Sequence, residues 1–335
     1  MKKTLKKFIV IGLCLAITGT GATVFPSLSE NYSVTVSAAT STYQNFEYEV
    51  LSDDTVQIVK YVGADSEITI PSVINNRNVT KIKGYAFNGA SSVKSVTLPE
   101  TMDEVTGYSF YGCYNLKTVN IPASVKNIGS YAFEFCSKLE NVNIAGNIDI
   151  VGSGAFYGCT LLSEFNFDRV SKLFSYSLLN TGLTSVSLPD NITFIGDHAM
   201  GFIYKNGTYT HVEGFTIEGE YDSEAQNYAN TYDIPFKPFL EYAVNDDNET
   251  VKITGYTGSK KELTIPDKID DMPVTVIGKG AFYDNHYIEK VTLPDTITHI
   301  GESSFMNCDR MTEIYLGKSL KTIDKSALVL LCAHV

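Results

Sequence analysis

Clusters of basic residues are missing from this sequence. Its 335 residues include 26 Lys and Arg against 38 Asp and Glu, and the formal net charge is −12. Nucleic-acid binding depends on grouped Lys and Arg side chains that neutralise phosphates, and docking on anionic lipid depends on the same groups. We therefore expect no nucleic-acid partner and no anionic lipid surface as a partner.

Catalytic and metal-binding signatures are also missing. The five His residues show no H-E-x-x-H spacing, and the sequence contains no G-x-S-x-G, no Walker loop and no dinucleotide-binding fingerprint. It contains no C-x-x-C pair and no EF-hand-type loop, which argues against zinc and calcium sites. We predict that the chain is not an enzyme and holds no cofactor and no metal.

No apolar run is long enough to cross a bilayer, which needs about 20 residues. The N-terminus instead has the organisation of an export signal, with four lysines before the apolar residues 8–17 and small residues at 36–38. An uncleaved anchor and a lipoprotein signal at Cys14 are the alternatives. The apolar run is short for an anchor, and Leu13 stands where a lipoprotein needs a small residue. We predict a cleaved signal peptide at 1–38, no membrane span after its cleavage, and a secreted or cell-surface protein.

An internal repeat dominates the rest of the sequence. Phenylalanine recurs every 23 residues, and several other apolar columns keep the same step. The shared pattern is I-x-x-x-A-F-x-x-C-x-x-L-x-x-V-x-I-P-x-x-V, and its phenylalanines are Phe87, Phe110, Phe133 and Phe156. A fixed period of this length predicts a solenoid in which each repeat forms one coil and stacks on its neighbours.

Each part of the repeat has a structural interpretation. The V-x-I positions alternate, as a short strand does when one of its faces meets a core. Proline often follows, as at Pro99 and Pro122, and ends the strand because it has no N–H to donate. The small residue before each Phe suits a tight helical turn on the opposite side. We predict short parallel strands on one face, short helical turns on the other, and about 23 residues per coil.

The repeat is organised in two modules, because residues 47–110 resemble residues 241–305 at an offset of 195. The second array stops without a polar cover, which favours truncation over an apolar edge that pairs with something else. A capping-box pattern at 223–226 predicts a helix that covers the first array. After the signal peptide, the predicted parts are a β-rich N-terminal cap at 39–81, a repeat array at 82–219, a helical C-terminal cap at 220–240, a β-rich start of the second module at 241–276, and a second, truncated array at 277–335.

These motifs resemble the treponemal-type, or BspA-like, leucine-rich repeat. The resemblance covers about residues 46–328, and its distinctive parts are the 23-residue step, the A-F-x-x-C turn and the V-x-I-P strand end. It implies a leucine-rich-repeat solenoid, a curved right-handed β/α superhelix, which is exported and displayed by bacteria. It also implies binding to host proteins, other cells or glycans, and no catalytic residues.

Cysteines occupy one column of the repeat, at Cys113, Cys136 and Cys159. Disulfide bonds and metal binding are the functional interpretations of this column. The five cysteines that remain after signal cleavage are an odd number, and identical columns favour buried free thiols that act as small apolar fillers.

Two surface columns are candidate binding sites. Outward strand positions form a polar ladder on the predicted concave sheet, where solenoids commonly bind, although any solvated sheet face carries such residues. A tyrosine column near the turns can hold a glycan or a protein partner, but packing on the convex turns is the interpretation that we favour. The ladder residues are Thr97, Thr118, Asn120, Asn141, Asn143, Glu164, Asn166 and Ser187, and the aromatic column is Tyr85, Tyr108 and Tyr131.

The sequence thus predicts a secreted or cell-surface repeat protein that mediates binding or adhesion to an extracellular protein or glycan. The alternative is a passive repeat scaffold or spacer in a larger extracellular assembly, with the active domain or anchor outside this chain.

Overall fold

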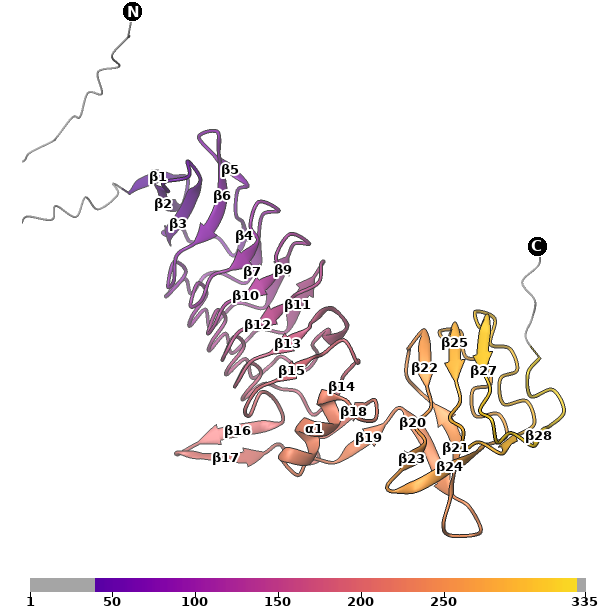
Figure 1. Ribbon diagram of the computed structural model, residues 1–335. Coiled ribbons are helices and arrows are strands. Elements are labelled where there is room, and N and C mark those ends of the chain that lie inside the picture. Colours follow the sequence, from indigo (N-terminus) through magenta and orange to yellow (C-terminus); the bar gives the residue numbers. More distant parts are fainter. Residues whose placement is uncertain (1–39, 330–335) are drawn as a thin grey trace, which may run out of the picture. The chain divides into compact units, whose positions relative to one another are not determined.

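The computed structural model describes residues 40–329, so the predicted signal peptide and Cys332 lie outside the described residues. The described chain is a β-solenoid with about 23 residues per coil. Strands of successive coils pair in parallel, and residues 23 positions apart become direct neighbours, as Thr118 is to Ser95 and to Asn141. Each apolar column of the sequence therefore becomes a row of side chains that runs along the stack (Figure 1).

One face of the first array, which we call the ladder face, carries the strands predicted from the V-x-I motif. They form a parallel sheet in the order β11-β9-β7-β4, and a separate sheet in the order β14-β18-β19 follows on the later coils. The strands are β4 (Glu67–Thr69), β7 (Ser95–Thr97), β9 (Thr118–Ile121), β11 (Asn141–Ile144), β14 (Ser185–Ser187), β18 (Thr216–Gly219) and β19 (Phe236–Pro238).

Each coil of the array also contributes a second short strand, which the sequence analysis did not separate from the turn. Its inward residues, such as Ile128 and Val151, are fully buried. These strands form a parallel sheet in the order β15-β13-β12-β10-β8. Their bounds are β8 (Glu104–Val105), β10 (Asn127–Ile128), β12 (Ile150–Val151), β13 (Lys172–Leu173) and β15 (Phe194–Ile195).

The predicted short helical turns are wrong. Within residues 40–329, helix is confined to the 3-10 helix η1 (Phe167–Arg169) and the α-helix α1 (Glu224–Thr231). A left-handed residue such as Tyr131, with φ 59°, stands just before the Ala-Phe pair and interrupts any helix there. The amides that follow bond to the next coil instead, as Phe133 N–H donates to Ala155 O at 2.8 Å. Turn hydrogen bonds between coils thus replace those that a helix would make within a coil.

The aromatic column forms the centre of the first array. Phe87, Phe110, Phe133 and Phe156 are fully buried, and neighbouring rings are stacked with centroids 4.6, 5.2 and 5.2 Å apart. The step between the coils is close to the spacing of paired strands, so identical residues in one column meet face to face.

The cysteine column lies beside the phenylalanines, and the prediction of buried free thiols is confirmed for Cys113, Cys136, Cys159 and Cys308. The Cys136 thiol donates to Phe110 O at 3.2 Å, and the Cys159 thiol donates to Phe133 O at the same distance. Burial raises the pKa of the Cys159 thiol far above its usual range, so the group stays protonated and unreactive.

The helix predicted at the end of the first array is confirmed as α1. Ser223 is its N-cap and accepts a hydrogen bond from Gln226 N–H at 3.3 Å. The Tyr228 hydroxyl donates to Met200 O at 2.8 Å and so ties the helix to the last coil. A hairpin of β16 (Phe202–Lys205) and β17 (Thr208–His211) extends from the same coil (Figure 1). Among the residues that the structure describes, no helix is long and apolar enough to cross a membrane.

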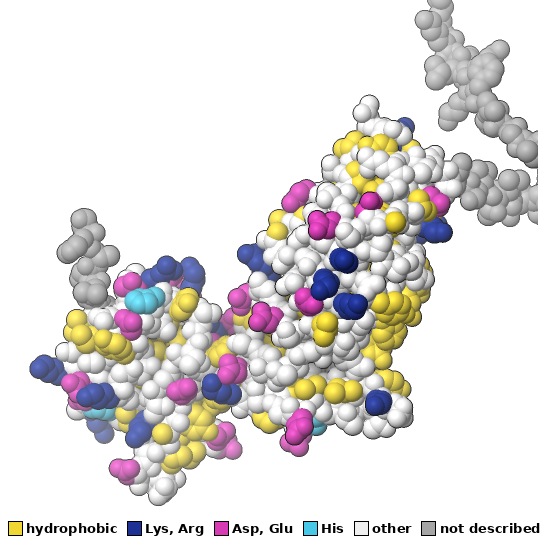
Figure 2. All heavy atoms as spheres, turned by 180° about the vertical axis from the view of Figure 1, so that it is seen from behind, with side chains coloured by type: hydrophobic (Ala, Val, Ile, Leu, Met, Phe, Trp, Pro, Cys, Tyr) yellow, Lys and Arg dark blue, Asp and Glu magenta, His cyan; other side chains and the backbone are white. Residues whose placement is uncertain are grey.

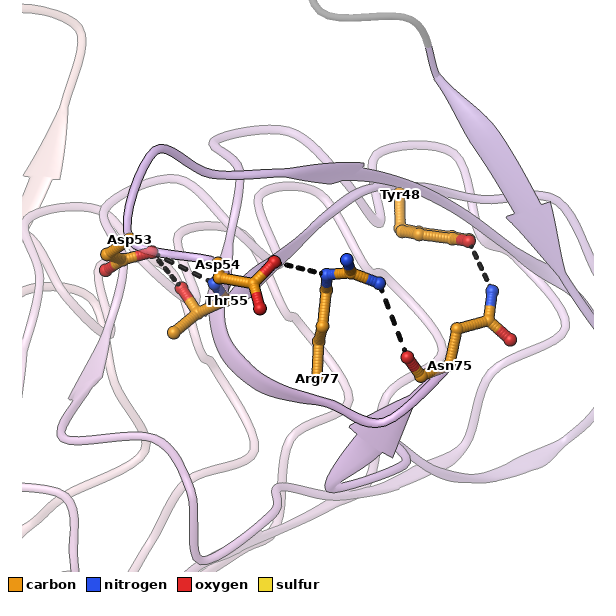
Figure 3. Close-up of polar contacts among 6 residues, drawn as sticks. All are labelled: Tyr48, Asp53, Asp54, Thr55, Asn75 and Arg77. Carbon is orange, nitrogen blue, oxygen red and sulfur yellow. Dashed lines mark hydrogen bonds and ion pairs between the residues drawn. The ribbon is translucent and has the colours of Figure 1, made fainter. Parts of the chain in front are cut away.

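The N-terminal module opens with a sheet in the order β1-β2-β3-β6-β5. Arg77 Nε lies 2.6 Å from an oxygen of Asp54, and Asn75 Nδ2 donates to the Tyr48 hydroxyl at 2.7 Å, so the two hairpin turns are fastened to the sheet (Figure 3). These strands are β1 (Ser41–Tyr43), β2 (Phe46–Val50), β3 (Val56–Tyr61), β5 (Val73–Ile74) and β6 (Arg77–Ile82).

The second module repeats this opening. Its Tyr242 hydroxyl donates to Asp270, as Tyr48 contacts Asn75 in the first module, and Leu240 to Ala327 supply a second cluster of buried residues. One sheet contains β20 (Leu240–Val244), β21 (Val251–Tyr256), β23 (Lys268–Ile269), β24 (Met272–Ile277), β26 (His299–Ile300) and β28 (Thr322–Ile323), and the other contains β22 (Glu262–Thr264), β25 (Lys290–Thr292) and β27 (Glu313–Tyr315).

An ion pair between coils makes the stability of the second module depend on pH. His286 Nδ1 lies 2.9 Å from Asp309 Oδ1, and this hydrogen bond raises the pKa of His286 and lowers the pKa of Asp309. A raised folded-state pKa of histidine contributes stability that is complete below the unfolded value of about 6.5 and is lost as the pH rises through the folded value. We expect His286→Asn to lower the free energy of unfolding at about pH 6 but not at about pH 9, where both forms lack the charge. Urea unfolding at the two pH values measures this, and an equal loss at both would contradict it.

Candidate binding surfaces

The polar ladder predicted on the strands is present over three coils. Asn143 Nδ2 donates to Asn120 Oδ1 at 2.7 Å, and Asn120 Nδ2 donates to Thr97 Oγ1 at 3.0 Å. The parallel register places these residues opposite one another, so the chain of hydrogen bonds runs from coil to coil. The ladder orients the amides, because each is held by a neighbour in the same column.

The other predicted ladder residues are placed differently. Thr118 and Asn141 begin the strands β9 and β11, two positions before the ladder, and Ser187 lies on the separate sheet that begins with β14. Glu164 and Asn166 lie on a segment that is not a strand. Asn166 leaves the ladder because its Oδ1 accepts from Asp168 N–H at 3.2 Å as the N-cap of η1. The ladder therefore ends at Asn143.

A hollow of about 550 Å³ lies along the ladder. One side is polar and consists of the ladder residues and Asn166, while the rest is mostly apolar. The volume is in the range of pockets that take small ligands or a peptide side chain. Sequence analysis missed its apolar members, although they are the V-x-I-P strand ends: Leu98, Ile121, Pro122, Val142, Ile144 and Ala145.

The sheet of the ladder face is interrupted next to this hollow. The amides of Lys117 and Thr118 donate to Lys94 O, and those of Glu140 and Asn141 donate to Lys117 O, but the pattern stops there. In the described part of the chain, no backbone hydrogen bond joins residues 163–167 to β11 or β14.

Two bulky side chains account for the interruption. Phe165 and Phe167 occupy columns that hold Val and Ile in the preceding coils, and Phe165 packs edge-on against Phe156 with centroids 5.4 Å apart. Val142 and Phe165 are consequently only partly buried, whereas Val119 in the same column is fully buried. Hollows of about 260 and 560 Å³ flank the segment, and Glu164 lines both. The interruption thus gives the ladder face accessible apolar side chains with a polar and acidic rim.

The tyrosine column lies on the turns. Tyr85 stacks on Tyr108 and Tyr108 on Tyr131, with centroids 5.1 and 5.0 Å apart, and Tyr85 is half exposed. All three have positive φ, of 66°, 60° and 59°, where the following coil has Gly154 at 62°. A left-handed conformation costs a residue with a side chain about 1–2 kcal/mol, which stacking worth about 0.5–1.5 kcal/mol per pair offsets in part.

A second aromatic column runs beside the first. Tyr111 lies edge-on to Phe135, and Phe135 is tilted against Tyr157, with centroids 5.9 and 5.2 Å apart. Figure 2 shows hydrophobic side chains, which include the tyrosines, gathered along one edge of the first array. Packing between the coils, which the sequence analysis favoured, describes the ring contacts but leaves the exposed edges of these rings free for a partner.

No group of three or more His, Cys, Asp and Glu side chains within residues 40–329 is arranged to hold a metal ion. The polar groups of the ladder face are amides and hydroxyls, with carboxylates at the rim, and they offer hydrogen bonds rather than acid–base chemistry. The two candidate surfaces are therefore suited to binding.

Comparison with protein families gives one match. The sequence model of the BspA type leucine rich repeat region matches six copies, over residues 80–206 and 255–331. This is a repeat family, and no enzyme family is indicated. A comparison with curated proteins gives no match.

Several solved structures are similar to the chain. A leucine rich cell surface protein from Faecalibacterium prausnitzii A2-165 is 26% identical with a TM-score of 0.42, over 85% of this chain and 78% of that one. A leucine rich repeat protein of T. pallidum is 17% identical with a TM-score of 0.37, over 83% of each chain. The pneumococcal vaccine antigen PcpA is 16% identical with a TM-score of 0.33, over 84% of this chain and 71% of that one.

Proposed function

Because the chain belongs to the BspA-type leucine-rich repeat family, we propose that it is a secreted or cell-surface binding protein that attaches to an extracellular protein or glycan through its ladder face. The export signal at 1–38 supports the location outside the cell. The hollow beside the hydrogen-bonded ladder of Thr97, Asn120 and Asn143 is the observation that carries the proposed site.

The chemistry of this hollow favours a neutral ligand with many hydrogen-bonding groups. Asn120 and Asn143 each use one amide N–H within the ladder and keep the other for a ligand. The neighbouring strand ends supply apolar area that a sugar ring or a peptide side chain can cover. Because the amides are already oriented, a ligand orders few side chains on binding.

A binding screen with the purified protein tests this function. The panel holds extracellular-matrix proteins, mucins and plant polysaccharides, each measured at low and at high salt. We expect at least one saturable interaction that survives high salt, since neutral hydrogen bonds and apolar contacts are screened little by ions. Folded protein that binds none of them would contradict the proposal and support a passive scaffold.

Removal of the ladder amides should weaken that interaction. We expect the double substitution Asn120→Ala with Asn143→Ala to lower the affinity at least tenfold, because each hydrogen bond contributes about 0.5–1.5 kcal/mol. The matched control is Asn115→Ala, whose amide donates to Ser91 O at 2.8 Å and lines none of the three hollows. Titration of the ligand from the screen measures both variants. Equal affinities for the double variant and the control would exclude the ladder as the site.

A further inference from the structure

Glu134 is a half-buried carboxylate for which the protein supplies no cation. It lies in the turn between the buried Phe133 and the half-buried Phe135, and its backbone carbonyl accepts from Gly112 N–H at 2.8 Å. Burial is the one cause that raises the pKa of its carboxyl, and within residues 40–329 its side chain has no hydrogen bond and no ion pair. An acidic group held in this state destabilises the folded protein unless a ligand uses it.

Aromatic side chains from three successive coils surround this carboxylate. Burial raises the phenol pKa of Tyr108, Tyr111 and Tyr157, and the nearby charge of Glu134 raises each of them further. Tyr108 and Tyr111 have ring centroids 6.2 Å apart, and Phe135 connects Tyr111 to Tyr157. The rings therefore form a partly open aromatic wall around a single negative charge.

Backbone strain in the same place points to a function. Tyr108 and Phe135 have φ of 60° and 59°, whereas other coils place Gly154, Gly112 and Gly158 in these two columns. The fold needs only a residue that tolerates a left-handed conformation there, so the large rings bring a cost that glycine avoids. Strained side chains of this kind are retained where they serve a binding site.

We propose that Glu134, Tyr108, Tyr111 and Tyr157 form a receptor site for the guanidinium group of an arginine on a partner protein. An organic cation is attracted both by the rings and by the carboxylate. A guanidinium can stack on an aromatic ring while its N–H groups bond to a carboxylate and to phenol oxygens. A quaternary ammonium has no N–H for the carboxylate, and the ammonium of lysine is more strongly hydrated. The net charge of −12 also favours a basic partner.

This site is independent of the proposed function on the ladder face. It uses turn residues, and none of them lines the hollows along the ladder. Loss of arginine binding with an intact ladder interaction, or the reverse, therefore distinguishes the two proposals.

Titration with N-acetyl-arginine methylamide tests the site. The sequence has no tryptophan, so intrinsic fluorescence reports on tyrosines alone. We expect saturable quenching with a dissociation constant in the millimolar range, as suits one small cation, and weaker binding of N-acetyl-lysine methylamide and of choline. Binding of choline that is tighter than that of the arginine probe, or no saturable binding of the arginine probe, would overturn the proposal.

Glu134→Gln is the decisive variant. We expect it to weaken binding of the arginine probe about tenfold, since it removes the charge but keeps the side-chain shape. The matched control is Glu104→Gln, which removes the same charge from a half-buried position on β8 and should bind as the wild type does. Circular dichroism confirms that both variants fold. Equal affinities of the two variants would show that Glu134 holds no cation.

Discussion

Replacing Phe133 with alanine is expected to lower the free energy of unfolding by about 3–5 kcal/mol. Phe133 is fully buried, and its ring stacks between those of Phe110 and Phe156 at 5.2 Å on each side. Truncation leaves a cavity in the middle of the column, and both flanking rings lose a partner. Because a coil contacts only its neighbours, a central gap also weakens the coupling between the two halves of the array.

Urea unfolding followed by circular dichroism measures this loss. Phe194→Ala is the control, because Phe194 is 44% exposed and its truncation should change stability little. Phe133→Leu keeps most of the volume and should cost less than the alanine substitution. A loss for Phe133→Ala no larger than that for Phe194→Ala would show that the phenylalanine column does not hold the coils together.

Gly152→Val is expected to cost about 3 kcal/mol or more, because of crowding between coils. A Cβ atom at this position would lie 2.6 Å from Ser130 N, 2.8 Å from Gly129 C and 2.9 Å from Ile128 O. All three are backbone atoms of the preceding coil, so no side chain can move aside. The same glycine donates its N–H to Ile128 O at 2.7 Å, and a larger residue separates that pair.

A second glycine separates crowding from backbone strain. Gly207 has φ of 83° in the turn of the β16–β17 hairpin, and a Cβ atom there would meet nothing within 4 Å. Gly207→Ala should therefore lose only the cost of the left-handed conformation, about 1–2 kcal/mol. Thermal unfolding of both variants gives the comparison. If Gly152→Val is the milder of the two, the coils are able to separate at Gly152 without loss of stability.

The repeat architecture could be predicted because its information is periodic. Phe133 recurs in its column every 23 residues, so the stacked core and the buried thiol of Cys136 followed from spacing alone. The helix α1 followed from a local capping pattern at Ser223. Both signals depend on neighbours in one column or on one turn, and no long-range packing decides them.

The turns and the ladder could not be predicted completely. The turn at Tyr131 is compatible with a helix by propensity, but its amides bond to the next coil, and this competition exists only once the coils stack. Asn166 has the right residue type and spacing for the ladder. It caps η1 instead, because the bulk of Phe165 and Phe167 breaks the strand pairing at that coil.

The sequence by itself determined the repeat, the columns that are buried, the family and the absence of catalytic motifs, since each of these is written in residue types at fixed spacing. Only the tertiary structure decided which surface residues act together. The hollow beside Asn120, the interruption at Phe165 and the unpaired carboxylate of Glu134 among three tyrosines each depend on side chains from different coils. Their arrangement arises from stacking, which sets the distance and the tilt between coils and so determines whether neighbouring columns touch.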